Sequence, residues 1–386
     1  MAHVLRAAGY EVVFGVANLV SVKPVLNAVG YASIRIPVAL PGTKSSFGGS
    51  AMGHAEVLLG SGFSDGQQAL AGVQAWYSLL VRVQPAAVLV DASPLALYVA
   101  RCMGLRSMAI GHGFDIPPQN LKPCFAPWTD DAHQRMEAGA RELQGVFDQL
   151  AVALSGHWGR QVPTSMDDLF DPAHCFLCTW PELDYFDRPG LTPEEASSYE
   201  GPIWGAFPGA RPHRWPENSR EGQRSKVLCY VYLREKHFDL IWQTLAQAGA
   251  DVLVIAPGAS EDVCQAVRAF KVQVINYSVQ LGSLLSQCDV VLCQGGMGLV
   301  SMALHAGKPL LLLPEYMEHA VLAYRLVRQG LALATARLHD MTVVKDKVER
   351  LLGDAQLARA AGALAEKYAG YSPLLAAEHA AFRLLE

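Results

Sequence analysis

Charged residues are scarce in this chain of 386 residues: Asp, Glu, Lys and Arg make up 17% of it, and the formal net charge is −5. Proteins that bind nucleic acid carry an excess of Lys and Arg, so this balance argues against nucleic acid as a partner. Long apolar runs are also absent, because none approaches the roughly 18–20 residues of a membrane-spanning helix. The opening residues MAHVLRAAGYEVVF lack the basic-then-apolar order of a signal peptide. These absences predict a cytoplasmic protein without a transmembrane segment.

Cysteines are few, eight in the whole chain, and their scatter is typical of reduced, buried thiols rather than of a disulfide framework. Only Cys175 and Cys178 form a C-x-x-C pair, next to His174. A redox or zinc site needs a helix N-terminus or a second ligand pair, and the sequence shows neither. The segment HCFLCTW is better interpreted as a strand. An Asp-x-Asp motif is absent as well, and we expect neither a metal nor a cofactor.

Apolar residues, by contrast, are abundant and make up 51% of the chain. A chain of this length should hold two domains, since single cores rarely grow beyond roughly 250–300 residues. Short apolar runs alternate with helical segments of about ten residues in both halves, which is typical of βαβ units and parallel sheets. The predicted fold class is therefore α/β. Strands are predicted at 11–16, 32–36, 86–90, 107–110, 227–233, 252–255 and 272–275.

The domain boundaries are predicted from changes in composition. Residues 1–205 form the first α/β domain and 226–365 the second. Residues 206–225, rich in Pro, Gly and charge, are expected to link them. The alanine- and leucine-rich tail, 366–386, is expected to form a helix.

The most informative stretch is 289–330, which predicts a strand, a glycine turn, a helix, a second strand and a second helix. The glycines of QGGMG lie where the first helix begins. Backbone N–H groups point outward there and carry partial positive charge, so a phosphate is the natural ligand. The second helix, 318–329, is expected to place Ala320, Ala323, Tyr324 and Val327 on one face.

The string QGGMGLVSMAL-x-AGKPLLLLP-x-x-x-EH resembles the donor-site signature of GT-B glycosyltransferases, the UDP-glycosyltransferase-like superfamily that includes macrolide and flavonoid glycosyltransferases. Upstream, INYSVQLGSLLSQCDVVLC resembles the segment that carries the family's base-contacting aromatic. In the first half, AAVLVDASPLALYVARCMGL resembles the family's strand–Asp–helix segment. The resemblance covers nearly the whole chain. It implies two Rossmann-like domains facing a cleft, with the C-terminal helix crossing back to the first domain.

The resemblance implies a donor site in the second domain. Gly295, Gly296 and Gly298 would cradle the diphosphate of a nucleotide sugar; a plain strand–glycine–helix turn is the structural alternative. Gln294 stands where the family usually has a phosphate-binding His, and it can donate a hydrogen bond but carries no positive charge. Leu299 replaces the usual Thr and removes a hydroxyl near the phosphates.

The resemblance also implies contacts to the base and the sugar. Tyr277 would stack on the nucleobase. Glu318 would accept hydrogen bonds from sugar hydroxyls, although an acid in the first turn of a helix is favoured in any case. His319 replaces the usual Gln and keeps a donor. Met302 replaces the Glu that binds ribose in many members, so the nucleotide type stays open.

In this family a general-base His deprotonates the acceptor hydroxyl, and an Asp orients that His. By resemblance Asp91 is the orienting carboxylate. The base His belongs to a loop after the first strand, and both are missing here because Met1 begins inside the following helix. We therefore expect an N-terminally truncated chain in which both neighbours of the missing strand have unpaired edges. His112 is a weaker catalytic candidate, and a structural or acceptor-pocket role suits it better than that of the base.

The function that the resemblance implies is transfer of a sugar, with inversion, from a nucleotide-diphosphate donor to a hydroxyl of a small-molecule acceptor by a monomer or homodimer. The acceptor pocket is expected from the loops around 41–66 and 112–130, with Trp76, Trp128 and Trp180 as lining or core residues. A catalytically inactive nucleotide-sugar-binding relative is the first alternative. A nucleotide-sugar epimerase would need carboxylate acid–base pairs that we do not find. A dehydrogenase is less favoured, because no G-x-G-x-x-G opens the first half.

Overall fold

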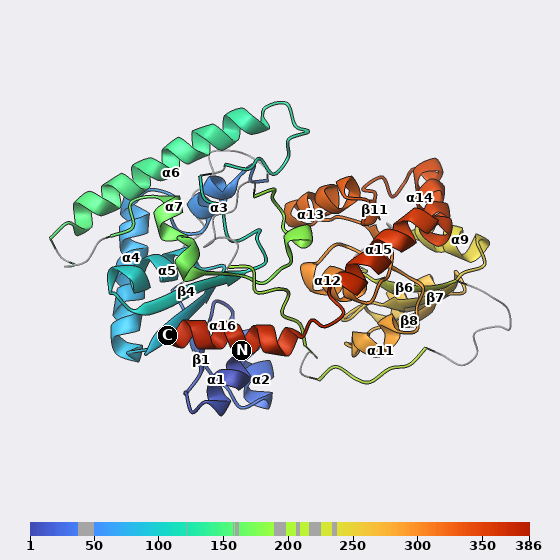
Figure 1. The fold of residues 1–386 in the computed structure, drawn as a ribbon, viewed down its shortest axis with the longest axis horizontal. Coiled ribbons are helices and arrows are strands. Elements are labelled where there is room, and N and C mark those ends of the chain that lie inside the picture. Colours follow the sequence, from blue (N-terminus) through green and yellow to red (C-terminus); the bar gives the residue numbers. More distant parts are fainter. Residues whose placement is uncertain are drawn as a thin grey trace. The chain divides into compact units, whose positions relative to one another are not determined.

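A computed structural model describes residues 1–37, 50–120, 122–156, 158, 162–188, 198–205, 209–215, 225–233 and 238–386 (Figure 1). The chain divides into two compact units. Unit 1 comprises Met1–Ile203 together with Pro373–Glu386, and unit 2 comprises Trp204–Ser372. Much of the linker predicted at 206–225 falls outside the described residues. No helix among the described residues is long and apolar enough to cross a membrane.

Unit 2 is built on a six-stranded parallel sheet with the strand order β11-β10-β9-β6-β7-β8. Its strands are β6 (Lys226–Tyr230), β7 (Asp251–Ile255), β8 (Gln273–Ile275), β9 (Val290–Cys293), β10 (Leu310–Leu312) and β11 (Ala332–Ala334). Its helices are α9 (Asp239–Gln247), α10 (Glu261–Arg268), α11 (Leu281–Leu285), α12 (Met297–His305), α13 (Met317–Arg328), α14 (Met341–Gly353) and α15 (Ala355–Lys367). The central strand β6 pairs with β7 on one side and with β9 on the other. The strand order therefore reverses at the carboxyl end of β6.

The core of unit 2 explains why its strands are continuous apolar runs. All four residues of β9 and all three of β10 are buried, as expected of strands that are covered on both faces by helices. Helix α13 differs from the sequence prediction. Its buried side chains are Val321, Leu322, Ala323 and Leu326. Of the face predicted from the sequence, Ala323 is buried, whereas Tyr324 and Val327 are 41% and 43% exposed.

Unit 1 contains two separate parallel sheets. Strand β1 (Val13–Val16) pairs with β2 (Ala32–Arg35), and a three-stranded sheet has the order β3 (Ala87–Asp91), β4 (Arg106–Gly111), β5 (Cys175–Leu177). The strand predicted in HCFLCTW is confirmed as β5. The helices are α1 (Ala2–Ala7), α2 (Leu19–Ala28), α3 (His54–Gly60), α4 (Gly66–Val83), α5 (Pro94–Cys102), α6 (Ala132–Leu154), α7 (Met166–Leu169) and α16 (Pro373–Leu385).

The two sheets of unit 1 share one core without pairing. Ile34 of β2 and Val88 of β3 both pack against the same cluster of buried side chains. Among the described residues, β1 pairs only with β2, and β3 pairs only with β4. One edge of each of these strands thus lacks a strand partner, whereas the sheet of unit 2 is continuous through its centre.

Helix α16 packs on unit 1, as the fold resemblance implied. It contacts α1, β3 and β4, and Figure 1 shows it in red beside these elements. Its inner residues Ala380 and Leu384 join Phe176 of β5 in one buried cluster. The buried carboxylate of Glu200 pairs with both His379 and Arg383 of the helix. These contacts fix the end of the chain to the first unit.

Candidate functional site

The glycine turn of unit 2 lies at the point where the strand order reverses. Gln294 follows β9, and its side-chain Oε1 accepts a hydrogen bond of 2.9 Å from the backbone N–H of Tyr232, just past β6. The Gln294 Nε2 donates to Glu315 Oε2, 2.8 Å away, after β10. One buried amide therefore joins the carboxyl ends of three neighbouring strands. In open α/β sheets, ligands bind at the carboxyl ends of the strands beside such a switch point.

The first turn of α12 is open. The helix begins at Met297, two residues earlier than the sequence predicted, with Gly296 at its N-cap. Val300, Ala303 and Leu304 are buried and hold one face of the helix against the core; each fully buried Val or Leu contributes about 1.5–3 kcal/mol. Gly296 and Gly298 are exposed, and a Cβ built on either would meet no atom within 4 Å. The uncapped N–H groups of this turn form an accessible site for an anion.

The start of α13 closes the other side of the turn. Gly295 has φ +102°, and a Cβ placed there would lie 3.4 Å from Cβ of His319. The His319 ring packs against Tyr316 with ring centroids 5.4 Å apart, and its Nδ1 is buried without a hydrogen-bond partner among the described residues. Burial lowers the pKa of His319, and the carboxylates of Glu318 and Glu315 oppose that shift.

Leu299 and Tyr277 are less closely tied to the turn. Leu299 is partly buried in the first part of α12. Tyr277 follows the edge strand β8, three strand spacings or roughly 14 Å from β9. One face of its ring is covered by the Arg211 guanidinium, 4.7 Å from the ring centroid. The same connection carries α11, which contacts α12, so the chain after Tyr277 returns toward the glycine turn.

In unit 1 the two catalytic candidates lie at the ends of neighbouring strands. Asp91 ends β3 and pairs in register with Ile110 of β4, and His112 comes two residues later. Burial raises the pKa of Asp91, and His112 acts against that rise by electrostatic attraction. The His112 ring also lies 5.4 Å from the ring of Tyr185, between centroids.

A buried ion pair supports the loop that carries His112. Asp184 is fully buried, and its carboxylate accepts a hydrogen bond of 2.6 Å from Nε of Arg188 and another from the hydroxyl of Tyr199. Gly113 has φ +97°, and a Cβ there would stand 2.5 Å from Asp184 Oδ1. Only glycine fits this close approach. The loop is thus held by the Asp184–Arg188 ion pair. Loss of the Asp184 carboxylate would leave the buried charge of Arg188 uncompensated.

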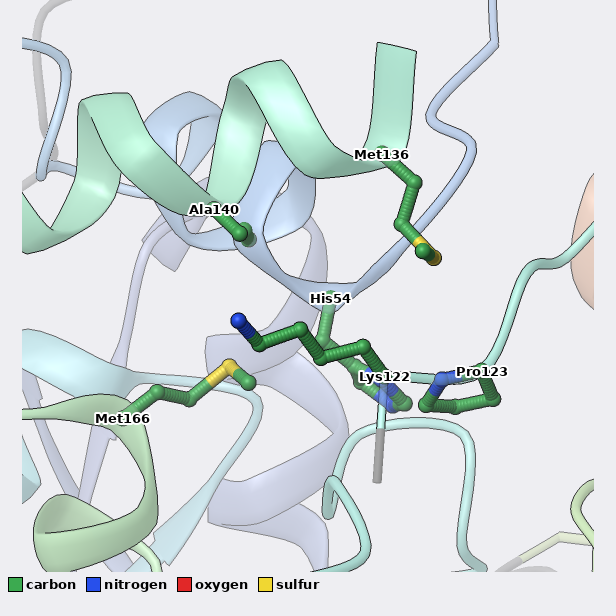
Figure 2. A pocket seen from close by; sticks show the side chains of 7 residues that line it. His54, Lys122, Pro123, Met136, Ala140 and Met166 are labelled. Carbon is green, nitrogen blue, oxygen red and sulfur yellow. The ribbon is translucent and has the colours of Figure 1, made fainter. Parts of the chain in front are cut away.

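A small pocket in unit 1 is lined by His54, Lys122, Pro123, Met136, Ala140 and Met166, among others (Figure 2). Its volume of about 20 Å³ holds about one water molecule, which is too little for a sugar acceptor. His54 is buried, with Nε2 2.9 Å from the carbonyl of Phe114 and Nδ1 without a partner among the described residues. Burial and the nearby Arg188 lower the pKa of His54 to about 3.

The sequence did not single out His54. Residues 41–66 were predicted to form acceptor-pocket loops, but the described part of that range contains helix α3, so the loop prediction was wrong there. The segment before α3 is rich in Gly and Ser, a composition typical of loops, so the short helix was not predicted. Glu56 is buried in α3 and pairs with Arg135 of α6 at 3.3 Å. The range 41–49 lies outside the described residues.

The tryptophans considered for the acceptor pocket differ in exposure. Trp76 and Trp180 are 8% and 3% exposed and belong to the interior, whereas Trp128 is 52% exposed.

Burial raises the pKa of both the Cys175 and the Cys178 thiol to about 12, so both are protonated at neutral pH. No group of three or more His, Cys, Asp or Glu side chains in the described part of the chain is placed to hold a metal ion.

Comparison with known proteins identifies the fold of the chain. No protein-family model and no curated protein sequence matches the chain. Among solved structures, the chain is similar to the glycotransferase of kitacinnamycin, with 17% identity, a TM-score of 0.69, and 99% of this chain and 93% of that chain covered. The calicheamicin glycosyltransferase CalG4 has 17% identity and a TM-score of 0.69, with 99% and 92% covered.

The spinosyn rhamnosyltransferase SpnG complexed with thymidine diphosphate is 20% identical, with a TM-score of 0.58 and coverage of 99% and 94%. At these identities the likeness defines the fold alone. The chain has the α/β fold of GT-B glycosyltransferases over its whole length. Because one fold can carry several activities, the function is argued from the site.

Proposed function

We propose that this protein is a glycosyltransferase that moves a sugar from a nucleotide diphosphate to a hydroxyl of a small organic acceptor. The observation that carries the proposal is the open glycine turn at the switch point of unit 2. The N–H groups at this helix start suit a diphosphate, and Glu318 next to it suits sugar hydroxyls. The structural neighbours act as glycosyltransferases according to their names, and one is complexed with thymidine diphosphate.

The donor is bound by unit 2. Gly295, Gly296 and Gly298 leave space for the diphosphate, with Leu299 beside them on α12. Gln294 shapes the turn by joining Tyr232 to Glu315. Tyr277, at the end of β8, stacks on the nucleobase with the face that Arg211 leaves open.

The acceptor is deprotonated by His112, with Asp91 stabilising the resulting imidazolium. The acceptor O–H proton passes to a ring nitrogen of His112 while the acceptor oxygen bonds to the anomeric carbon of the sugar. The bond from that carbon to the diphosphate oxygen breaks, and its electron pair leaves with the nucleotide diphosphate. A single displacement inverts the anomeric centre. A general base of this kind contributes typically 10²–10⁴-fold to the rate.

The test is a transfer assay on the full chain with uridine- and thymidine-diphosphate sugars and a panel of hydroxylated polyketide aglycones, read by mass spectrometry. We expect a product heavier by one sugar residue, whose anomeric configuration is opposite to that of the donor. The variants His112→Ala and Asp91→Asn should lower kcat by about 10²-fold or more with donor affinity unchanged. Loss of donor affinity in either variant would contradict these roles.

One observation favours a second candidate, a binding protein that does not turn over its ligand. The amide of Gln294 is held between Tyr232 and Glu315 and provides no positive charge for the leaving diphosphate. This candidate predicts saturable binding of nucleotide sugars without release of nucleotide diphosphate for any acceptor. Product formation above that of the uncatalysed mixture excludes it.

A further inference from the structure

The phosphate turn of unit 2 needs a source of positive charge. A nucleotide sugar carries two phosphate charges, and amide donors with a helix dipole offset only part of them. Gln294 is neutral, and its Nε2 donates to the carboxylate of Glu315. That carboxylate places a further negative charge close to the turn. Gln294 and Glu315 thus supply no positive charge to the turn, and a cation from another group would offset the charge of the ligand.

His319 is the group whose position and surroundings meet this need. It lies against Gly295, and its Nδ1 is buried without a partner among the described residues. An unsatisfied buried polar atom costs about 1–3 kcal/mol, so a ring held in this way by structure alone is unfavourable. The ring as a whole is only partly buried, so a ligand in the turn would reach it from its exposed side.

The charged groups that act on His319 are two carboxylates from its own segment, Glu315 and Glu318. On the side of the glycine turn it faces Gly295, and at the start of its own helix it faces the ring of Tyr316. Burial outweighs the carboxylates and lowers the pKa of the free His319. The imidazole is therefore largely neutral at pH 7 until a new negative charge reaches it.

We propose that His319 becomes protonated when a nucleotide sugar binds and supplies the cation that holds its diphosphate. This inference rests on the proposed function and adds to it a proton-linked donor site. A bound diphosphate raises the pKa of His319, so protein and ligand together take up a proton. Affinity is then highest below the pKa of the free protein and is lost as the pH rises through the pKa of the complex.

The experiment is calorimetric titration of the full chain with thymidine-diphosphate glucose and uridine-diphosphate glucose at pH 5.5, 6.5, 7.5 and 8. A nucleotide sugar is used because its phosphates do not titrate in this range, whereas the terminal phosphate of a free nucleotide diphosphate has a pKa of about 6. Titrations in two buffers of different ionisation enthalpy give the number of protons taken up.

For the wild type we expect Kd to rise about tenfold or more from pH 5.5 to pH 8, since each unit of pKa difference corresponds to a factor of ten, with uptake of up to one proton. His319→Gln should bind more weakly at pH 5.5 and show no uptake. The matched control is His339→Gln, an exposed histidine between β11 and α14, which should behave as the wild type does.

The outcomes separate the two proposals. Wild-type binding that is independent of pH, or a pH dependence that persists in His319→Gln, overturns the role of His319 and leaves the glycosyltransferase proposal standing. No binding of any nucleotide sugar to the wild type at any pH overturns the glycosyltransferase proposal itself. Melting temperatures of all variants at each pH verify that the protein is folded.

Discussion

At the scale of single residues, His54 and His319 have different roles, although the Nδ1 of each lacks a hydrogen-bond partner among the described residues. His54 is enclosed in unit 1 by Phe125 and Phe186, each about 4.9 Å away between ring centroids. His319 is partly exposed beside a turn with open space. His54 is a neutral interior residue, whereas His319 is a candidate contact for a bound molecule. Residue type alone could not separate them, because the difference lies in what surrounds each ring.

His54 should make the protein sensitive to acid. Its pKa is lowered from 6.5 in a model peptide to about 3 in the fold, so the unfolded chain takes up the proton first. Stability is then lost as the pH falls from about 6.5 toward 3, by about 1.4 kcal/mol per pH unit. Urea unfolding of the wild type and of His54→Gln at pH 7, 6 and 5 measures this loss.

Between pH 7 and pH 5 the wild type should lose about 2 kcal/mol more of its free energy of unfolding than His54→Gln does. Glutamine keeps an N–H donor for the Phe114 carbonyl but has no ionisable ring. Parallel stability curves for the two proteins would show that His54 is not the acid-sensitive group.

At the scale of elements, the strand–turn–helix unit after β9 was predictable because its signals are local. The order of strands and helices there follows from the apolar runs, the glycine cluster, and Gly307 and Pro309 at the end of the first helix. The buried face of α13 was not predictable in the same way. Apolar residues surround most of that helix, and the contact with its neighbours selects Val321 and Leu322 rather than Tyr324 and Val327.

Gly295 and Gly298 of this unit should respond in opposite ways to substitution by alanine. Gly295 has φ +102°, so Gly295→Ala should cost about 1–3 kcal/mol and press on His319. Gly298 is in the first turn of α12 with open space around it, so Gly298→Ala should stabilise the helix by about 0.5–1 kcal/mol. Thermal melting of both variants measures the two effects. Equal shifts would mean that the backbone of the turn is not strained.

At the scale of the whole molecule, the chain is two α/β units; in its described residues the second unit has one continuous sheet and the first has two. The alternation of strands and helices predicted both halves from sequence. The division of unit 1 into two sheets depends on which strand edges meet, and apolar pattern does not specify this. The prediction of the acceptor-pocket loops was the least accurate. The shape of a pocket depends on packing between segments that are distant in the sequence, and on contacts such as the Asp184–Arg188 pair.

The positions of the catalytic candidates were partly predictable. Asp91 was placed at the end of a strand by its apolar run, and the structure puts it there. His112 follows the end of the neighbouring strand because β3 and β4 pair in register, and the order of elements alone does not specify that pairing. The assignment of His112 as the base is therefore a structural proposal rather than one from sequence.

The central claim is that the first turn of α12 binds the diphosphate of a nucleotide sugar, and the variant Gly298→Asp tests it most directly. An acidic side chain in the first turn of a helix favours folding, and a Cβ at this position meets no atom within 4 Å. The same charge repels a diphosphate. Gly298→Asn, which is nearly the same size and uncharged, is the matched control.

The measurement is the Kd for thymidine-diphosphate glucose, by calorimetry at pH 6.5, for the wild type and both variants. We predict that Gly298→Asp melts no lower than the wild type and binds at least about tenfold more weakly than Gly298→Asn, since one added like charge at this range is worth about 1.4 kcal/mol or more. Equal affinities for the Asp and Asn variants, with nucleotide sugar still bound, would contradict the placement of the diphosphate at this turn.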